Sequence, residues 1–206
     1  TGETDIIIVA VPDKSLEAVL ANTECSERTI VAHTAGSFGL EIFPGTIKRA
    51  GLFYPLQTFS RGRSLNFGEI PFFVDGSDNE TEEVLKELAR SLGSKTFKSD
   101  TAKRRMLHAA AVFVCNFTNF MLTSGKAVSE KAGFTFDILV PLINETISRA
   151  IESGPEDSQT GPASRNDHIT IEKHLELLSF SPELRKLYEE VTRSIISFYK
   201  EKLKNE

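Results

Sequence analysis

The stretch that decides the fold is DIIIVAVPD, residues 5–13, because it joins a buried strand to the start of a helix. Residues 5–11 form a nearly unbroken apolar, largely β-branched run, which is typical of a parallel strand buried on both faces. Pro12 follows, and Asp13 is a good N-cap for the amphipathic helix that KSLEAVLA predicts. A strand followed directly by a helix is the repeating unit of an α/β sheet.

The alternation of strands and helices continues to about residue 98. Apolar strands are expected at residues 29–33, 51–59 and 70–76, and an amphipathic helix over residues 78–93. KTFKS, residues 95–99, predicts one more edge strand. This order favours a layered α/β sheet with right-handed crossovers.

The pattern changes to helices alone from Ser99 onward. Residues 99–133 predict one long helix, and its Ala-rich, nearly all-round apolar middle indicates burial between other helices. Residues 135–153 predict a second helix, kinked or started at Pro141. After one long loop, a short helix and a final helix beginning at Pro182 complete the chain. We therefore expect two domains, an α/β domain over 1–98 and a helical domain over 99–206.

Bulk composition excludes several classes of partner. The chain has 206 residues and a formal net charge of -5, which argues against binding nucleic acid through its phosphates. No unbroken apolar run approaches the roughly 18 residues of a membrane helix, and no signal peptide is evident, so no membrane partner is expected. Cys25 and Cys115 form no zinc or disulfide pattern, and we expect a reducing cytoplasm and no bound metal. Because Thr1 leads almost directly into a buried strand, we also expect an N-terminal portion to be missing.

Two predicted strands end in small and hydroxyl-bearing residues. In doubly wound sheets the ligand lies beyond the carboxyl ends of the strands, where backbone groups and helix N-termini face it. The first such end is Val11, Pro12 and Asp13, and the second comprises His33, Thr34, Ala35, Gly36 and Ser37. Ordinary strand-to-helix turns would explain them equally well. The chain contains no G-x-G-x-x-G fingerprint.

Polar residues interrupt the apolar pattern of the long helix. His108, Val112, Cys115 and Asn119 share one stripe in an ideal helix, and Asn116 lies one residue round from it. Such groups belong either to a satisfied core network or to a site. We expect Cys115 to be a small core hydrophobe, and Lys103, Arg104 and Arg105 to form a solvated face.

The loop before the short helix, TGPASRNDHITIEKHLELL at residues 160–178, combines turn, cation and cap. Gly161-Pro162 rigidifies a turn, Arg165 offers a planar fork for a carboxylate or phosphate, and Asp167 or Asn166 can cap the helix. His168 and His174 are too far apart in helical phase for an obvious metal pair. From these residues alone, a helix cap and a binding wall remain equally good interpretations.

Together these segments resemble one known family. DIIIVAVPD, HTAGS, FYPLQTF, HAAAVFVCNFTNF and TGPASRNDHITIEKHL occur in the order and at the separations of the Rossmann-like NAD(P)-dependent oxidoreductases whose helical C-terminal domain has unknown function. The family is similar to deazaflavin-dependent NADP oxidoreductases, pyrroline-5-carboxylate reductases and the 6-phosphogluconate dehydrogenase superfamily. The resemblance implies a partial doubly wound, Rossmann-like parallel sheet followed by an all-α domain similar to the C-terminal domain of 6-phosphogluconate dehydrogenase.

The resemblance also implies roles for individual residues. It places Val11, Pro12 and Asp13 beside the cofactor ribose, and His33, Thr34, Gly36 and Ser37 near the nicotinamide of NADP or NAD. His108 and Asn116, with Arg165 and Asp167, would line a cleft between the domains, and Tyr54 would contact substrate where the family usually has histidine. Val112 stands where related hydroxyacid dehydrogenases have a catalytic lysine, so His108 becomes the substitute proton donor.

These implications lead to an expected function and two alternatives. We expect an NAD(P)-dependent oxidoreductase that passes hydride between the nicotinamide and a small carbonyl or imine compound. We expect cofactor binding to be impaired in a chain without the glycine-rich loop. The alternatives are a non-catalytic nucleotide sensor and a dimerisation module, and a homodimer through the helical domain is expected in any case.

Overall fold

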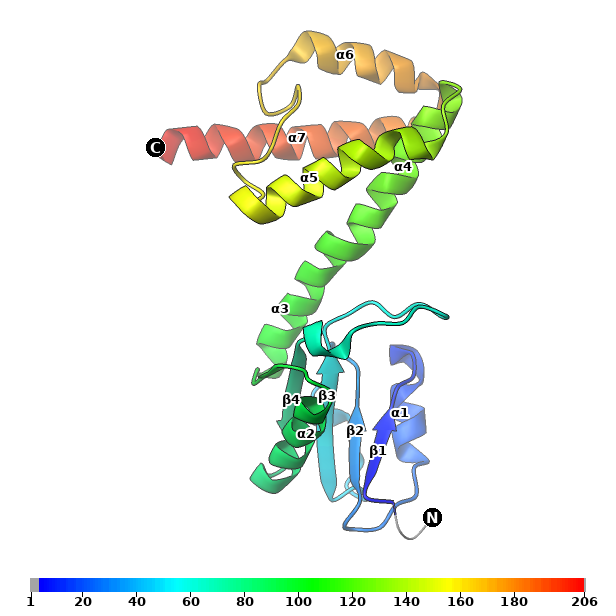
Figure 1. Cartoon of the computed structure of the whole chain (residues 1–206), viewed down its shortest axis with the longest axis vertical. Helices are drawn as coiled ribbons and strands as arrows, with labels where there is room; N and C mark the ends of the chain where they lie inside the picture. The colour runs from blue at the N-terminus through cyan, green and yellow to red at the C-terminus, as the bar shows by residue number, and fades with distance from the viewer. Residues whose placement is uncertain (1–3, 206) are drawn as a thin grey trace. The chain divides into compact units, whose positions relative to one another are not determined.

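The computed structural model describes residues 4–205, which form two compact units (Figure 1). The first unit extends to Thr118 and the second begins at Asn119. The boundary between the two units therefore falls inside the long helix. The first part of that helix bonds to Tyr54 of the sheet and to the loop that ends at Phe38. The boundary expected at residues 98 and 99 divides the chain by type of secondary structure and stays a prediction.

The first unit contains a five-stranded sheet in which the strands follow chain order. The strands are β1 (Ile6–Val9), β2 (Ile30–His33), β3 (Arg49–Pro55), β4 (Phe72–Gly76) and β5 (Thr96–Phe97). β1, β2 and β3 are parallel to one another, and β5 is parallel to β4. This confirms the partial, Rossmann-like α/β sheet.

The expectation that the sheet is parallel throughout is wrong at one pair, because β4 runs antiparallel to β3. The connection between these strands holds a short 3-10 turn, η2 (Phe67–Glu69), and no crossover helix. A parallel neighbour requires such a crossover, whereas an antiparallel neighbour can follow a simple loop. The chain therefore turns back beside β3.

Helices α1 (Asp13–Ala21) and α2 (Asn79–Ser91) cover opposite faces of this sheet (Figure 1). Successive residues of a strand point to opposite faces, so β2 contributes to two cores. Val31 packs with Leu16 of α1, whereas Ala32 belongs to the cluster that contains Leu85 of α2. The sheet is thereby fixed between two helices while its carboxyl edge is left for loops.

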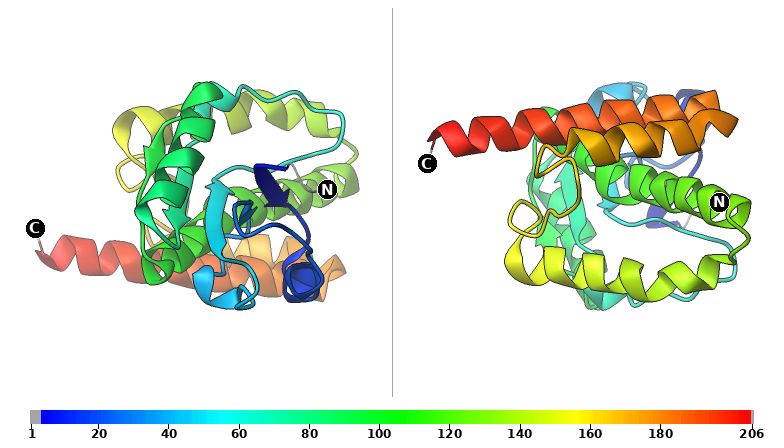
Figure 2. Two further views of the ribbon diagram at one scale, coloured as in Figure 1. Left: turned by 90° about the horizontal axis from the view of Figure 1, so that it is seen from below. Right: turned by 90° about the horizontal axis from the view of Figure 1, so that it is seen from above.

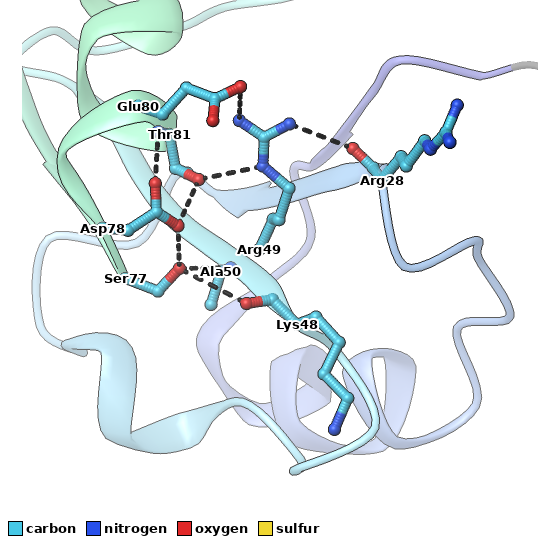
Figure 3. A network of polar contacts seen from close by, with 8 residues as sticks. All are labelled: Arg28, Lys48, Arg49, Ala50, Ser77, Asp78, Glu80 and Thr81. Carbon is cyan, nitrogen blue, oxygen red and sulfur yellow. Dashed lines mark hydrogen bonds and ion pairs between the residues drawn. The ribbon is translucent and has the colours of Figure 1, made fainter.

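A polar network holds the start of α2 at the amino end of β3 (Figure 3). Asp78 caps the helix, accepting from the Thr81 backbone N–H at 2.8 Å and from the Thr81 hydroxyl at 2.8 Å. These hydrogen bonds, first that from the backbone, lower the pKa of Asp78. Arg49 joins Thr81 through a 3.2 Å hydrogen bond and pairs with Glu80 at 3.1 Å. The network is structural and lies at the amino end of β3.

The long helix predicted from the sequence is confirmed, with one irregularity. α3 (Thr101–Ala111) continues through a π-helical segment, Val112–Phe117, into α4 (Thr118–Lys131). In a π-helix each hydrogen bond spans five residues instead of four, so residues beyond the segment are rotated. The stripe expected through His108, Val112, Cys115 and Asn119 assumed an ideal α-helix, so it is wrong for Cys115 and Asn119.

The apolar surface of this helix also differs from expectation. By length and composition alone the helix could cross a membrane, since one 18-residue window has a mean hydropathy of 1.4. None of that window is buried within the chain, although we expected its middle to be covered by other helices. The mean hydropathy is high although the segment contains Asn116, Thr118 and Asn119, because most of its other residues are aliphatic or aromatic.

The second unit consists of helices and connecting turns. A 3-10 turn, η4 (Phe136–Leu139), leads into α5 (Val140–Ser153), with Pro141 in its first turn. α6 (His168–Leu177), the turn η5 (Leu178–Phe180) and α7 (Pro182–Asn205) follow. α6 and α7 lie side by side, as Figure 2 shows.

Candidate functional site

The carboxyl ends of β1, β2 and β3 lie at one edge of the sheet because these strands are parallel. The loops after β1 and β2 meet there, where the Ser37 hydroxyl donates a hydrogen bond to the Asp13 carboxylate. Asp13 is the first residue of α1, and Pro12 is its N-cap, without a side-chain cap. The prediction of Asp13 as N-cap is therefore wrong, because its carboxylate joins the neighbouring loop instead.

His33 ends β2 and is completely buried, with 0% of its surface exposed. Its Nδ1 accepts from the Ala35 backbone N–H at 3.3 Å, and its Nε2 lies 3.2 Å from the Gly39 carbonyl oxygen. Burial is the main cause that lowers the pKa of His33, so the ring is neutral near pH 7. A neutral ring that accepts at Nδ1 carries its proton on Nε2 and donates to Gly39. His33 thus fixes the backbone of the loop after β2 through these two hydrogen bonds.

Gly36 lets the loop after β2 lie directly on the ring of Tyr54. A Cβ added to Gly36 would meet Tyr54 Cζ at 2.7 Å, closer than real Cβ atoms approach. Tyr54 is the penultimate residue of β3, and only 8% of it is exposed. Any larger residue at position 36 must displace the ring or the loop.

Tyr54 in turn contacts α3. Its hydroxyl lies 3.3 Å from Nδ1 of His108, whose ring is exposed at the protein surface. Burial, the largest cause, raises the pKa of Tyr54, with Arg104 opposing and Asp13 adding to the shift. The phenol is therefore protonated over the ordinary pH range. Two residues 54 positions apart in the sequence form one polar pair.

Two arginines of α3 hold the loop after β2 in place. Arg104 is completely buried and donates to the carbonyl oxygens of Phe38 at 2.8 Å and Ser99 at 3.0 Å. Arg105 donates from Nε to the Ser37 carbonyl oxygen at 2.7 Å. Burial lowers the pKa of Arg104, but a guanidinium remains charged in proteins.

The prediction of a solvated face at Lys103, Arg104 and Arg105 is wrong for Arg104. The signal that could have found it is helical phase, since Arg104 lies three and four residues before Leu107 and His108.

The remaining predicted residues lie elsewhere. Asn116 is exposed within the π-helical segment, a type of irregularity that is frequent at functional sites.

Arg165 is exposed in the second unit, and the described residues offer its side chain no hydrogen bond. Of the two expected caps, Asp167 is the N-cap of α6, and both its carboxylate oxygens bond to Thr170. These bonds lower the pKa of Asp167. The interdomain cleft itself stays a prediction.

The edge of the first unit offers groups suited to a dinucleotide. The N-terminus of α1 has no side-chain cap, and the segments Val11–Asp13 and Thr34–Ser37 provide backbone groups and hydroxyls beside it. Gly36 has no side chain, and its loop lies directly on the buried Tyr54 ring. Among residues 4–205, His, Cys, Asp and Glu form no cluster of three that could bind a metal.

Comparison with solved structures identifies the class of fold. The "putative NADP oxidoreductase BF3122" from Bacteroides fragilis is 38% identical with a TM-score of 0.86, covering 94% of this chain and 75% of that one. Protein TM1727 from Thermotoga maritima is 20% identical with a TM-score of 0.75, covering 98% and 81%. The pyrroline carboxylate reductase of Plasmodium falciparum, solved with NADP bound, is 12% identical with a TM-score of 0.52, covering 94% and 79%. The chain is thus a Rossmann-like α/β protein with an added helical unit.

Residues 70–195 match the family model described as Domain of unknown function (DUF2520). The chain belongs to the DUF2520 family. Comparison with curated protein sequences gives no match.

Proposed function

We propose that this protein is an NAD(P)-dependent oxidoreductase acting on a small carbonyl or imine compound. The observation that carries the proposal is the Tyr54–His108 pair beside the glycine-containing loop at the carboxyl edge of the sheet. In sheets of this type the ligand lies at that edge. The 38% identity to a protein described as an NADP oxidoreductase supports the same activity.

Residues of two loops would hold the cofactor. Val11, Pro12 and Asp13 would face its ribose, and Thr34, Gly36 and Ser37 its nicotinamide, above the buried ring of His33. When bound, the cofactor supplies or accepts the hydride. The chain has no G-x-G-x-x-G segment, so we expect it to bind NADPH only weakly.

The protein's own residues would position the substrate and move the proton. His108 would exchange a proton with the reacting oxygen or nitrogen, and Asn116 would orient the substrate by hydrogen bonding. Arg165 would bind an anionic group, since its guanidinium is exposed and its neighbour Asp167 is committed to the helix cap. Tyr54, too buried to be the main substrate ligand, would act through His108.

Titration with NADPH, followed by turnover with a panel of small carbonyl and imine compounds, tests this function. We expect saturable binding that Gly36→Val weakens at least tenfold, because the added side chain must displace the Tyr54 ring or the loop that would hold the cofactor. Gly45→Val is the matched control, since a Cβ there meets nothing within 4 Å. Circular dichroism verifies that both variants fold.

Two results would contradict the proposal. NADPH binding that is absent, or that both variants weaken equally, removes the cofactor site. Saturable binding without oxidation of NADPH by any compound of the panel would instead favour a nucleotide sensor.

We further infer a homodimer formed through the helical unit. That unit contains an apolar cavity of about 830 Å³, lined among others by Val128 of α4, Leu178 of η5 and Leu184 of α7. Outside it, Leu142 and Ile151 of α5 are 65% and 80% exposed. Apolar surface of this extent is uncommon on monomers and supports a second copy as the covering partner. A cytoplasmic location is also proposed, because Cys25 and Cys115 are both free thiols.

A further inference from the structure

Tyr54 and His108 differ sharply in how firmly they are held. The ring of Tyr54 lies under Gly36 and beside Phe73, with ring centroids 6.3 Å apart in the latter pair. Its hydroxyl therefore occupies a fixed place. His108 is exposed, and the described residues give its side chain only one hydrogen bond, the 3.3 Å contact from Nδ1 to that hydroxyl. The orientation of the imidazole thus depends on Tyr54.

The hydrogen bond also selects which ring nitrogen carries the proton. The buried phenol retains its proton and can donate to Nδ1 of the neutral imidazole, which leaves the ring proton on Nε2. When the imidazole gains a second proton, Nδ1 becomes a donor and the phenolic oxygen accepts. Because a hydroxyl can play both roles, the contact survives in both protonation states.

We propose that Tyr54 is a positioning residue for His108: it binds Nδ1 in both protonation states, so that Nε2 points outward as the proton donor. This inference rests on the proposed oxidoreductase function. During reduction, hydride adds to the substrate carbon and the electron pair of the double bond moves to its oxygen or nitrogen. That atom takes the proton from Nε2 of the imidazolium, whose Nδ1–H continues to donate to the Tyr54 oxygen. Nε2 then regains a proton from solvent, which restores the donor.

The helical unit supplies an internal comparison. His174 and Tyr188 form a second pair, with Nδ1 and the hydroxyl 2.8 Å apart, at the wall of the apolar cavity. This pair belongs to α6 and α7 and lies within another unit of the chain. A substitution that removes its hydroxyl should leave His108 unchanged.

Long-range ¹H–¹⁵N spectra of the four imidazoles test the proposal without any substrate. Resonances are assigned with His108→Gln and His174→Gln. At a pH where His108 is neutral, we expect ¹⁵N shifts of a single tautomer protonated on Nε2. In Tyr54→Phe, which keeps the ring under Gly36, the two nitrogen shifts should move toward each other. Tyr188→Phe should produce that change at His174 alone.

Kinetics with an active member of the compound panel separate positioning from binding. We expect Tyr54→Phe to lower kcat about tenfold with KM nearly unchanged, a fraction of what general acid catalysis contributes. A higher KM at unchanged kcat would make Tyr54 a substrate ligand and overturn the proposal. So would identical His108 spectra in wild type and Tyr54→Phe, or a native proton on Nδ1. Thermal unfolding confirms that the variant is folded, and failure of NADPH binding alone would contradict only the proposed function.

Discussion

Arg104 shows how a single buried cation can order a loop at the residue scale. Its guanidinium donates to the carbonyl oxygen of Phe38, in the loop after β2, and to that of Ser99, just before α3. Hydrogen bonds to a charged donor are stronger than neutral ones, and burial makes their loss costly. Its Nε has no partner among the described residues.

We expect Arg104→Met to destabilise the protein by about 3 kcal/mol, because it leaves two carbonyl groups without their donor. Lys103→Met is the matched control, since the neighbouring side chain is 80% exposed and its substitution should be nearly neutral. Chemical denaturation measures both. Equal losses of stability in the two variants would show that Arg104 does not hold the loop.

Individual site residues were partly predictable from the sequence. Local spacing alone predicted a capping residue just before α6, but it could not choose between Asn166 and Asp167. The structure gives Asp167. Asn166 in fact adopts a positive φ of 55°, which asparagine tolerates. The Tyr54–His108 contact could not be predicted, because it joins a strand end to a helix through tertiary packing.

At the scale of elements, helix caps respond to pH with a definite sign. The folded state lowers the pKa of Asp78, so the carboxylate stabilises the native protein above its unfolded pKa. That contribution is lost as pH falls through the folded value. Asn can replace the cap without a charge.

We therefore expect the stability difference between pH 7 and pH 3 to be smaller in Asp78→Asn than in wild type. Thermal unfolding at both pH values measures it. Asp5→Asn removes the same charge at an exposed residue whose carboxylate makes no hydrogen bond to residues 4–205, and it should leave the difference unchanged. An unchanged difference in Asp78→Asn would show that the cap does not couple to protonation.

Elements were predicted better than their irregularities. The alternation of strands and helices was readable because burial on two faces imposes unbroken apolar runs, as in β2, whose four residues are all buried. The burial expected of the first run was wrong, because β1 is an edge strand in which only Val9 is buried. The antiparallel turn of β4 was missed because apolar periodicity carries no information on strand direction. The π-helical segment was missed because one inserted residue changes helical phase without changing composition.

The whole molecule exposes more apolar surface than its composition suggests. Phe113, Val114 and Ile151 are 67%, 75% and 80% exposed, on the long helix and on α5. The sequence showed that these residues are apolar but could not show whether another part of the same chain covers them. A second copy is the covering partner we propose.

We expect Ile151→Asp to shift the protein from dimer to monomer, since a buried carboxylate without a partner is strongly unfavourable. Ser148→Asp places the same charge on an exposed polar position of α5 and should leave the dimer intact. Sedimentation velocity over a range of concentrations measures both. A wild type that stays monomeric at every concentration would contradict the dimer.

The placement of Tyr54 has an optical consequence. The chain contains no tryptophan and three tyrosines, so its tyrosine emission comes from Tyr54, Tyr188 and Tyr199. Tyr188 bonds to His174, and Tyr199 donates to the Glu156 carbonyl oxygen, both in the helical unit. Tyr54 is thus the sole tyrosine of the sheet unit. Its emission, isolated by subtracting that of Tyr54→Phe, would report directly on whatever occupies the carboxyl edge.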